Sequence, residues 1–254
     1  MLYGIFEAIF IQFPFQLLVS EAVFLTDSPK RTHFLPRLLI GFMLQILLSA
    51  LWNAVLTPYE STSLFYYMLL YLGFAFFTAI PIWGSFDLEL RELIFILAGG
   101  YATEHMIFAL SRIILQQLHN LYPLYGSLSH LLLTRYVIYL AGAAAVYFLI
   151  IRPNKKANQL SDGDFRIVVL AFIIMVFAIG FSVYWSYPEE YMGTSMGDVI
   201  CPAYSFLCCA LVLLMEYYVL RENSMKREQE MMEQLLQIST AQQKSSKEAI
   251  DITT

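Results

Sequence analysis

Long apolar segments alternate with short polar connections along most of the chain. An α-helix needs about 20 apolar residues to cross the hydrocarbon core of a bilayer. Seven segments meet this requirement, at about residues 3–25, 34–56, 63–83, 91–116, 130–151, 166–185 and 198–220. The pattern therefore predicts an all-α membrane protein with a seven-helix transmembrane domain over residues 1–220. The charged stretch that follows, residues 221–254, predicts a coiled-coil helix outside the membrane.

The composition fits a protein whose solvent is the lipid bilayer. Hydrophobic residues make up 59% of the 254 residues and charged residues only 14%, whereas soluble domains carry about a quarter charged residues. Lysine and arginine are scattered rather than arranged as a basic stripe, which argues against nucleic acid as a partner. The three cysteines, Cys201, Cys208 and Cys209, lie in the last apolar segment, where we expect them to pack as small residues.

Charges in the connections predict how the segments are oriented. The first connection holds Lys30 and Arg31, and the fifth holds Arg152. Arg221 opens the C-terminal stretch, whereas the second, fourth and sixth connections are acidic or neutral. Because lysine and arginine concentrate on the cytoplasmic side of membrane proteins, we expect the N-terminus outside the cell and the C-terminal helix in the cytoplasm. The third connection, SFDLELRE, does not fit this rule, because its net charge is negative.

The C-terminal stretch has the seven-residue repeat of a coiled coil. Steps of seven from Met231 and from Leu235 define a seam that is apolar at both ends and polar in the middle. Its members are Met231, Leu235, Ile238, Gln242, Ser245, Ala249 and Ile252. No Gly or Pro lies between Ala203 and Thr254, so the last crossing helix and this stretch can form one continuous helix. We expect a homodimer through the seam; the alternative is a solvated helix without a partner.

The sequence MEQLLQISTAQQKSSKEAIDITT behind a multi-span region resembles the end of the sensor half of bacterial receptor histidine kinases that carry a GHKL-type ATPase. Kinases that sense secreted peptides in quorum sensing are the nearest comparison. At the level of sequence, the resemblance covers residues 229–254. It implies a sensor of a two-component signal transduction system in the bacterial cytoplasmic membrane, with an extracellular peptide as ligand. It also implies that the helix leads into a phosphoacceptor segment and then an ATP-binding domain.

The four histidines do not supply that phosphoacceptor. They are His33, His105, His119 and His130, and all lie in apolar segments or short connections. The chain ends where the phosphoacceptor motif is expected, and it contains no glycine-rich ATP lid. We therefore expect no enzyme activity, catalytic residue or cofactor in residues 1–254, whereas the parent protein that the resemblance implies is a histidine kinase. Glu104 and His105 have no second metal ligand at helical spacing, so no metal site is predicted.

Four ionisable residues in the fourth and fifth apolar segments are candidates for ligand binding. A charged group at mid-bilayer costs about 2.5–3.5 kcal/mol on insertion scales, so each one needs a reason. Glu104, His105 and Arg112 lie in the fourth segment, and Arg135 lies in the fifth. Together they predict an outward-open polar cavity, in which the arginines bind an anionic group such as a peptide C-terminus. The alternative is that Glu104 pairs with an arginine of a neighbouring helix and only fixes the packing.

The first apolar segment carries polar groups on two sides. Gln12 and Gln16 are four residues apart and share one side of a helix, whereas Glu7 and Glu21 fall near the opposite side. We therefore expect this helix to lie inside the bundle, where its polar groups have a structural role.

Two other classes of function compete with a receptor. A transporter or channel is one, but the sequence shows no internal repeat and few segments broken by Gly or Pro. An intramembrane cysteine peptidase is the other, with Cys201 and His105 as candidate nucleophile and base, but no local motif joins them. A flux assay in liposomes separates a transporter from a receptor, and cross-linking at Leu235 tests the receptor.

Overall fold

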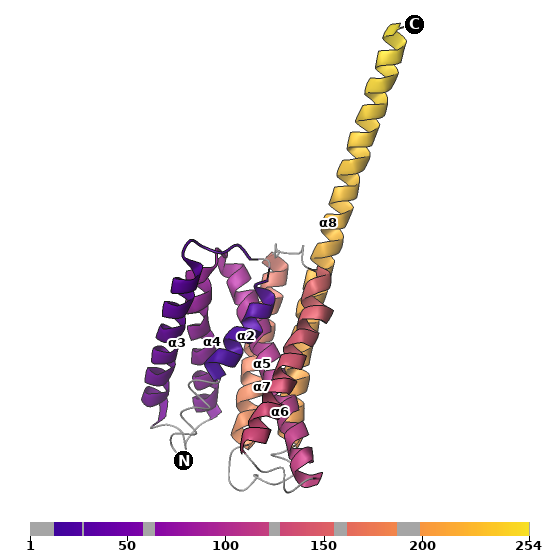
Figure 1. Ribbon diagram of the computed structural model, residues 1–254. Helices are drawn as coiled ribbons and strands as arrows, with labels where there is room; N and C mark the ends of the chain where they lie inside the picture. Colours follow the sequence, from indigo (N-terminus) through magenta and orange to yellow (C-terminus); the bar gives the residue numbers. More distant parts are fainter. Residues whose placement is uncertain are drawn as a thin grey trace.

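The computed structural model describes residues 13–26, 28–57, 64–121, 128–154, 162–186 and 199–253. Its helices form a bundle, from which one long helix extends (Figure 1). The α-helices are α2 (Phe13–Phe24), α3 (Phe34–Leu56), α4 (Leu64–Ser85), α5 (Leu90–Leu121), α6 (Leu128–Val146), α7 (Asp162–Ser186) and α8 (Cys201–Thr253). A π-helical turn, η3 (Tyr147–Ile151), and a 3-10 turn, η4 (Arg152–Asn154), continue α6. The prediction of an all-α membrane protein is confirmed.

Six helices, α3 to α8, are long and apolar enough to cross a membrane. Their positions agree with the last six predicted segments, and α3 matches its segment residue for residue. The first segment is represented by the shorter α2, because residues 1–12, including Glu7 and Gln12, lie outside the described residues. The chain is therefore a multi-pass membrane protein, and the seventh crossing stays a prediction.

Helix α5 is the central helix of the bundle. In the most apolar 18-residue stretch of α5, 78% of the residues are buried, whereas in the corresponding stretch of α3 only 17% are buried. Helices α2, α4, α6, α7 and α8 all contact α5, whereas α3 packs mainly on α4 (Figure 1). The apolar side chains that α3 exposes suit lipid, whose tails are as apolar as leucine.

Two adjacent glycines let other helices approach α5 closely. In hydrocarbon, helices associate through close packing, for which small residues are enriched at interfaces. A Cβ atom at Gly100 would lie 2.3 Å from Cγ of Glu21 in α2, and one at Gly99 would lie 2.4 Å from Oε2 of Glu216 in α8. Helices α2 and α8 therefore meet the α5 backbone at the same level. This contact confirms that the first apolar helix lies inside the bundle.

The connections before α3 and before α5 pack against each other. Lys30 and Phe86 pair as an isolated antiparallel bridge, and the main-chain N–H of Arg31 donates to the Ser85 carbonyl at 2.9 Å. The guanidinium of Arg31 lies 3.3 Å from a carboxylate oxygen of Asp87. The ion pair gives Asp87 of the acidic third connection a basic partner in the first connection.

The N-terminal ends of α5 and α7 lie at the end of the bundle where α8 leaves it (Figure 1). The guanidinium of Arg91 lies 5.9 Å from the centre of the Phe165 ring, and the Asn223 amide donates to Asp164 at 3.5 Å. The first and third connections and the described residues beside the fifth therefore share one end with the C-terminal part of α8, as the charge pattern predicts. That this end faces the cytoplasm stays a prediction from the charges.

Helix α8 continues from the bundle interior far beyond the bundle as one unbroken α-helix of 53 residues (Figure 1). Its buried face ends at Asn223 and Ser224, and most side chains after them are exposed. We call residues 225–253 the rod, which is roughly 40 Å long at 1.5 Å per residue. No Gly or Pro follows Ala203, so no residue interrupts the backbone hydrogen bonds.

Candidate functional site

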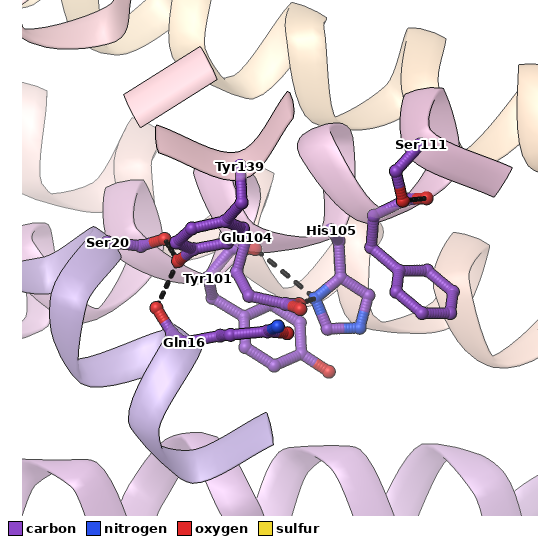
Figure 2. A network of polar contacts seen from close by, with 8 residues as sticks. Gln16, Ser20, Tyr101, Glu104, His105, Ser111 and Tyr139 are labelled. Atoms are coloured by element: carbon purple, nitrogen blue, oxygen red, sulfur yellow. Dashed lines mark hydrogen bonds and ion pairs between the residues drawn. The ribbon is translucent and has the colours of Figure 1, made fainter. Parts of the chain in front are cut away.

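The middle of α5 carries polar and aromatic side chains that face the bundle interior (Figure 2). Tyr101, Glu104 and His105 are all at most 5% exposed. Tyr101 and His105 are four residues apart and share one face of the helix, and Glu104 is the neighbour of His105. Three polar groups therefore lie at one level of the most buried of the six spans.

Glu104 and His105 make the closest polar contact of this cluster. The His105 Nδ1 atom lies 2.8 Å from Oε2 of Glu104, and both side chains are buried. The same nitrogen lies 3.3 Å from the carbonyl oxygen of Tyr101. Both neighbours are acceptors, so a proton on Nδ1 suits both contacts. The Glu104 oxygens receive no well-aligned hydrogen bond from the described residues, so this contact is close in distance but does not have the geometry of a hydrogen bond.

Aromatic rings hold the His105 imidazole in place. The Tyr101 ring lies 4.2 Å from it at 31°, and the Tyr71 ring of α4 meets it edge-on at 5.6 Å. Phe172 of α7 packs edge-on against Tyr101 at 5.9 Å. Rings of α4 and α5 thus contact the imidazole directly, and α7 supports it through Tyr101. Aromatic pairs of this geometry each contribute about 0.5–1.5 kcal/mol beyond the area they bury.

Tyr139 connects α6 to α2 beside the cluster (Figure 2). Its hydroxyl donates to the main-chain carbonyl of Gln16, and the Ser20 hydroxyl donates to the Tyr139 oxygen. Gln16 and Ser20 are one turn apart, so one face of α2 presents both partners. Helix α6 approaches α5 closely at this level, because Gly142 has no side chain and leaves room for Ile107 of α5.

The two predicted arginines lie farther along the bundle, away from the end where the rod begins. Arg112 is two turns beyond Glu104 on α5, and Arg135 is on α6. The Arg135 guanidinium lies 4.7 Å from the centre of the Phe108 ring, midway between Glu104 and Arg112 in the sequence. Both arginines are partly exposed, whereas Glu104 and His105 are buried. The structure thus separates the four predicted residues into a buried pair and a half-exposed pair.

Among the described residues, no ion pair between Glu104 and an arginine of a neighbouring helix is seen, so this alternative stays a prediction. In the described part of the chain, Glu104 lies within ion-pair distance of His105 of its own helix. Arg112 is about 12 Å farther along the helix axis, and Arg135 lies against the ring of Phe108. A ligand that approaches along α5 from the end opposite the rod therefore meets the arginines before the buried pair.

Two more buried carboxylates lie closer to the rod. Glu21 of α2 is 0% exposed and accepts a hydrogen bond of 2.5 Å from the Thr78 hydroxyl of α4. Glu216 of α8 is 1% exposed. Sequence reasoning assigned Glu21 a structural role and missed Glu216. The signal for Glu216 is visible in the sequence: it is an isolated acidic residue in an apolar segment, where an ionisable group is costly.

The predicted coiled-coil seam lies on the rod. Met231, Leu235 and Ile238 are 49%, 61% and 56% exposed, and Gln242 is exposed too. The seam residues whose side chains lie outside the described part of the chain are Ser245, Ala249 and Ile252. The single chain thus leaves an apolar stripe uncovered outside the bundle.

The described residues contain no group of three or more His, Cys, Asp or Glu side chains arranged to hold a metal ion. The interior does contain carboxylates, an imidazole and tyrosine hydroxyls, which are groups that donate, accept or exchange protons. Comparisons of the chain with protein-family models, with curated proteins and with solved structures found no match. The architecture and the buried polar groups are therefore the basis of the functional proposal.

Proposed function

We propose that this chain is the membrane receptor module of a two-component signalling system, and that it passes an extracellular signal through α8 to a dimerising rod. The continuity of α8 is the observation that supports this most (Figure 1). The same helix packs in the bundle interior and forms the rod. Each turn of an α-helix is hydrogen-bonded to the next, so a displacement of α8 inside the bundle reaches the rod.

Helix α8 can be displaced by the bundle through its packing contacts with neighbouring helices. Helix α8 packs mainly on α5 and α7. Cys209 and Val212 of α8 belong to the same core cluster as Tyr101 of α5 and Met175 of α7. Side chains at a packed helix interface change between a few distinct arrangements and do not deform gradually. A shift of α5 therefore repacks this contact and displaces α8.

The two half-exposed arginines are the residues that we propose bind the extracellular ligand. A guanidinium binds a carboxylate through two parallel N–H···O hydrogen bonds, so a peptide C-terminus is the ligand class that fits Arg112 and Arg135. Arg135 lies on Phe108 of α5. Phe108 is one turn from Glu104, so a ligand on Arg135 acts on the helix that carries the buried pair.

Cross-linking in membranes tests the dimeric rod. Leu235→Cys is expected to give a disulfide-linked dimer under mild oxidation, because a coiled coil places equivalent seam residues opposite each other. Thr240→Cys is the matched control, since five residues turn the helix to nearly the opposite face, and it should remain monomeric. Equal cross-linking of both variants, or none at Leu235→Cys, would count against the receptor module.

A transporter or channel is the second candidate, and the buried carboxylates of Glu21, Glu104 and Glu216 favour it. Intramembrane ionisable groups often mark ion and substrate pathways. The rod has no evident role in such a protein. Ion flux into liposomes along an imposed gradient would support the transporter, whereas sealed liposomes together with a Leu235→Cys dimer support the receptor.

A further inference from the structure

We propose that the bundle interior binds protons at the carboxyl groups of Glu21 and Glu216, which lie on two sides of the glycine pair of α5. The ligand is the proton itself, which forms an O–H bond with one carboxylate oxygen and is returned to water when that bond breaks. The proposal goes beyond the receptor role and does not depend on it.

Glu216 is enclosed by apolar groups. A Cβ atom at Gly99 would lie 2.4 Å from Oε2 of Glu216 and 2.5 Å from the ring of Phe24. The carboxyl group and this ring therefore share the space that the glycine leaves beside α5. One turn farther along α8, Leu220 packs in an apolar cluster with Ala98. Both Glu216 carboxylate oxygens are buried and receive no hydrogen bond from the part of the chain that the structure describes.

Glu21 lies on the other side of the same glycine pair. A Cβ atom at Gly100 would lie 2.3 Å from Cγ of Glu21. The Thr78 hydroxyl donates to Oε1 at 2.5 Å, while Oε2 is buried and has no hydrogen-bond partner among the described residues. The carboxyl group thus has one oxygen that accepts a hydrogen bond and one that is available to hold a proton.

The described titratable groups near Glu21 supply no positive charge. Tyr139 of α6 is hydrogen-bonded to Ser20, the residue before Glu21, and Glu104 of α5 lies about 6 Å farther along the helix axis than the glycine pair. The contact from α4 is the hydroxyl of Thr78, which does not titrate.

The surroundings of Glu216 are similar. Among the described titratable residues, Cys209 lies two turns back on α8, and Tyr147 of η3 packs on the apolar cluster that contains Leu220. Arg221, the nearest basic residue along α8, is exposed. The described groups that share its space do not titrate: they are Gly99 of α5 and the ring of Phe24 of α2.

A proton fits these two positions better than a larger ion. A buried carboxylate needs a compensating charge or several donors, and the described residues give neither Glu21 nor Glu216 an ion pair. A metal ion needs several ligand oxygens at once, which the described His, Cys, Asp and Glu side chains do not assemble here. A proton needs one oxygen, and each carboxyl group has one available.

Infrared difference spectroscopy of the full chain in lipid nanodiscs tests this proposal. A protonated carboxyl group gives a C=O stretching band that an ionised carboxylate lacks. In spectra that compare acidic with alkaline buffer, we expect Glu21→Gln to remove one such band and Glu216→Gln to remove another. Glu222→Gln is the matched control and should remove none from this region, because Glu222 is exposed and pairs with Lys226 at 2.7 Å.

The proposal is overturned if neither substitution removes a band, or if sodium ions rather than protons shift the carboxylate bands. Thermal unfolding provides a second readout. Glutamine reproduces the shape and neutrality of protonated glutamate, so both variants should keep a Tm close to that of the unmodified chain. Unfolding of both would show that the negative charge is required and would contradict the proposal. The cross-linking experiment with Leu235→Cys tests the receptor role independently of proton binding.

Discussion

The hydroxyl of Tyr139 is the contact that joins α2 to α6. It donates to the Gln16 carbonyl and accepts from Ser20. Tyr139→Phe removes both hydrogen bonds and keeps the ring, so we expect the free energy of unfolding to fall by about 1 kcal/mol, since an interhelical hydrogen bond in a membrane averages about 0.6 kcal/mol. Reversible unfolding in mixed micelles measures this. Tyr136→Phe, on the exposed side of α6, is the control, and an equal loss there would refute a specific role for Tyr139.

At the residue scale, part of the candidate site could be predicted from the sequence. Glu104 and His105 are recognisable because ionisable residues are rare in apolar segments. Glu216 obeys the same rule and could have been found by it. Tyr139 and Ser20 could not, because tyrosine and serine are frequent in membrane helices, and only the tertiary arrangement brings these two together.

At the scale of helices, Gly41 sets how closely α3 approaches α4. A Cβ atom at Gly41 would lie 2.6 Å from Cα of Pro81, a backbone atom that moves only if the helix moves. Gly41→Ala should therefore push the two helices apart and destabilise the bundle by about 1–3 kcal/mol, the range for overpacking. Thermal unfolding in detergent measures the loss.

The same helix pair offers a matched control for Gly41. No atom lies within 4 Å of the Cβ position at Gly84. Gly84→Ala should therefore cost nothing, and it can gain up to about 1 kcal/mol from helix propensity. If Gly41→Ala is as stable as Gly84→Ala, the close approach of α3 to α4 is not present in the protein.

The helices themselves could largely be predicted, because a crossing helix requires a long apolar run. Helix α3 matches its predicted segment from Phe34 to Leu56. The ends of other helices could not be derived in this way: α5 extends to Leu121, and α6 passes into the turn Tyr147–Ile151. Which helices surround α5 could not be predicted either, because the sequence of one segment does not show which neighbours it packs against.

At the scale of the whole molecule, the first and third connections share one end of the bundle with the rod. Asp87→Cys and Met231→Cys should therefore react with a membrane-impermeant maleimide from the same side of sealed vesicles. Thr57→Cys, at the opposite end of α3, should react only from the other side. Labelling of Asp87→Cys and Met231→Cys from different sides would refute this arrangement.

The most direct test of the account is a distance along α8. Spin labels at Arg221 and Gln242 of one chain lie roughly 30 Å apart if the helix is continuous. Pulsed EPR in nanodiscs, with labelled chains diluted by unlabelled ones, measures this distance. We predict one narrow distribution near that value, which glycines at Gln229 and Glu230 should broaden. A broad distribution with a shorter mean in the unmodified rod would contradict a rigid connection between the bundle and the rod.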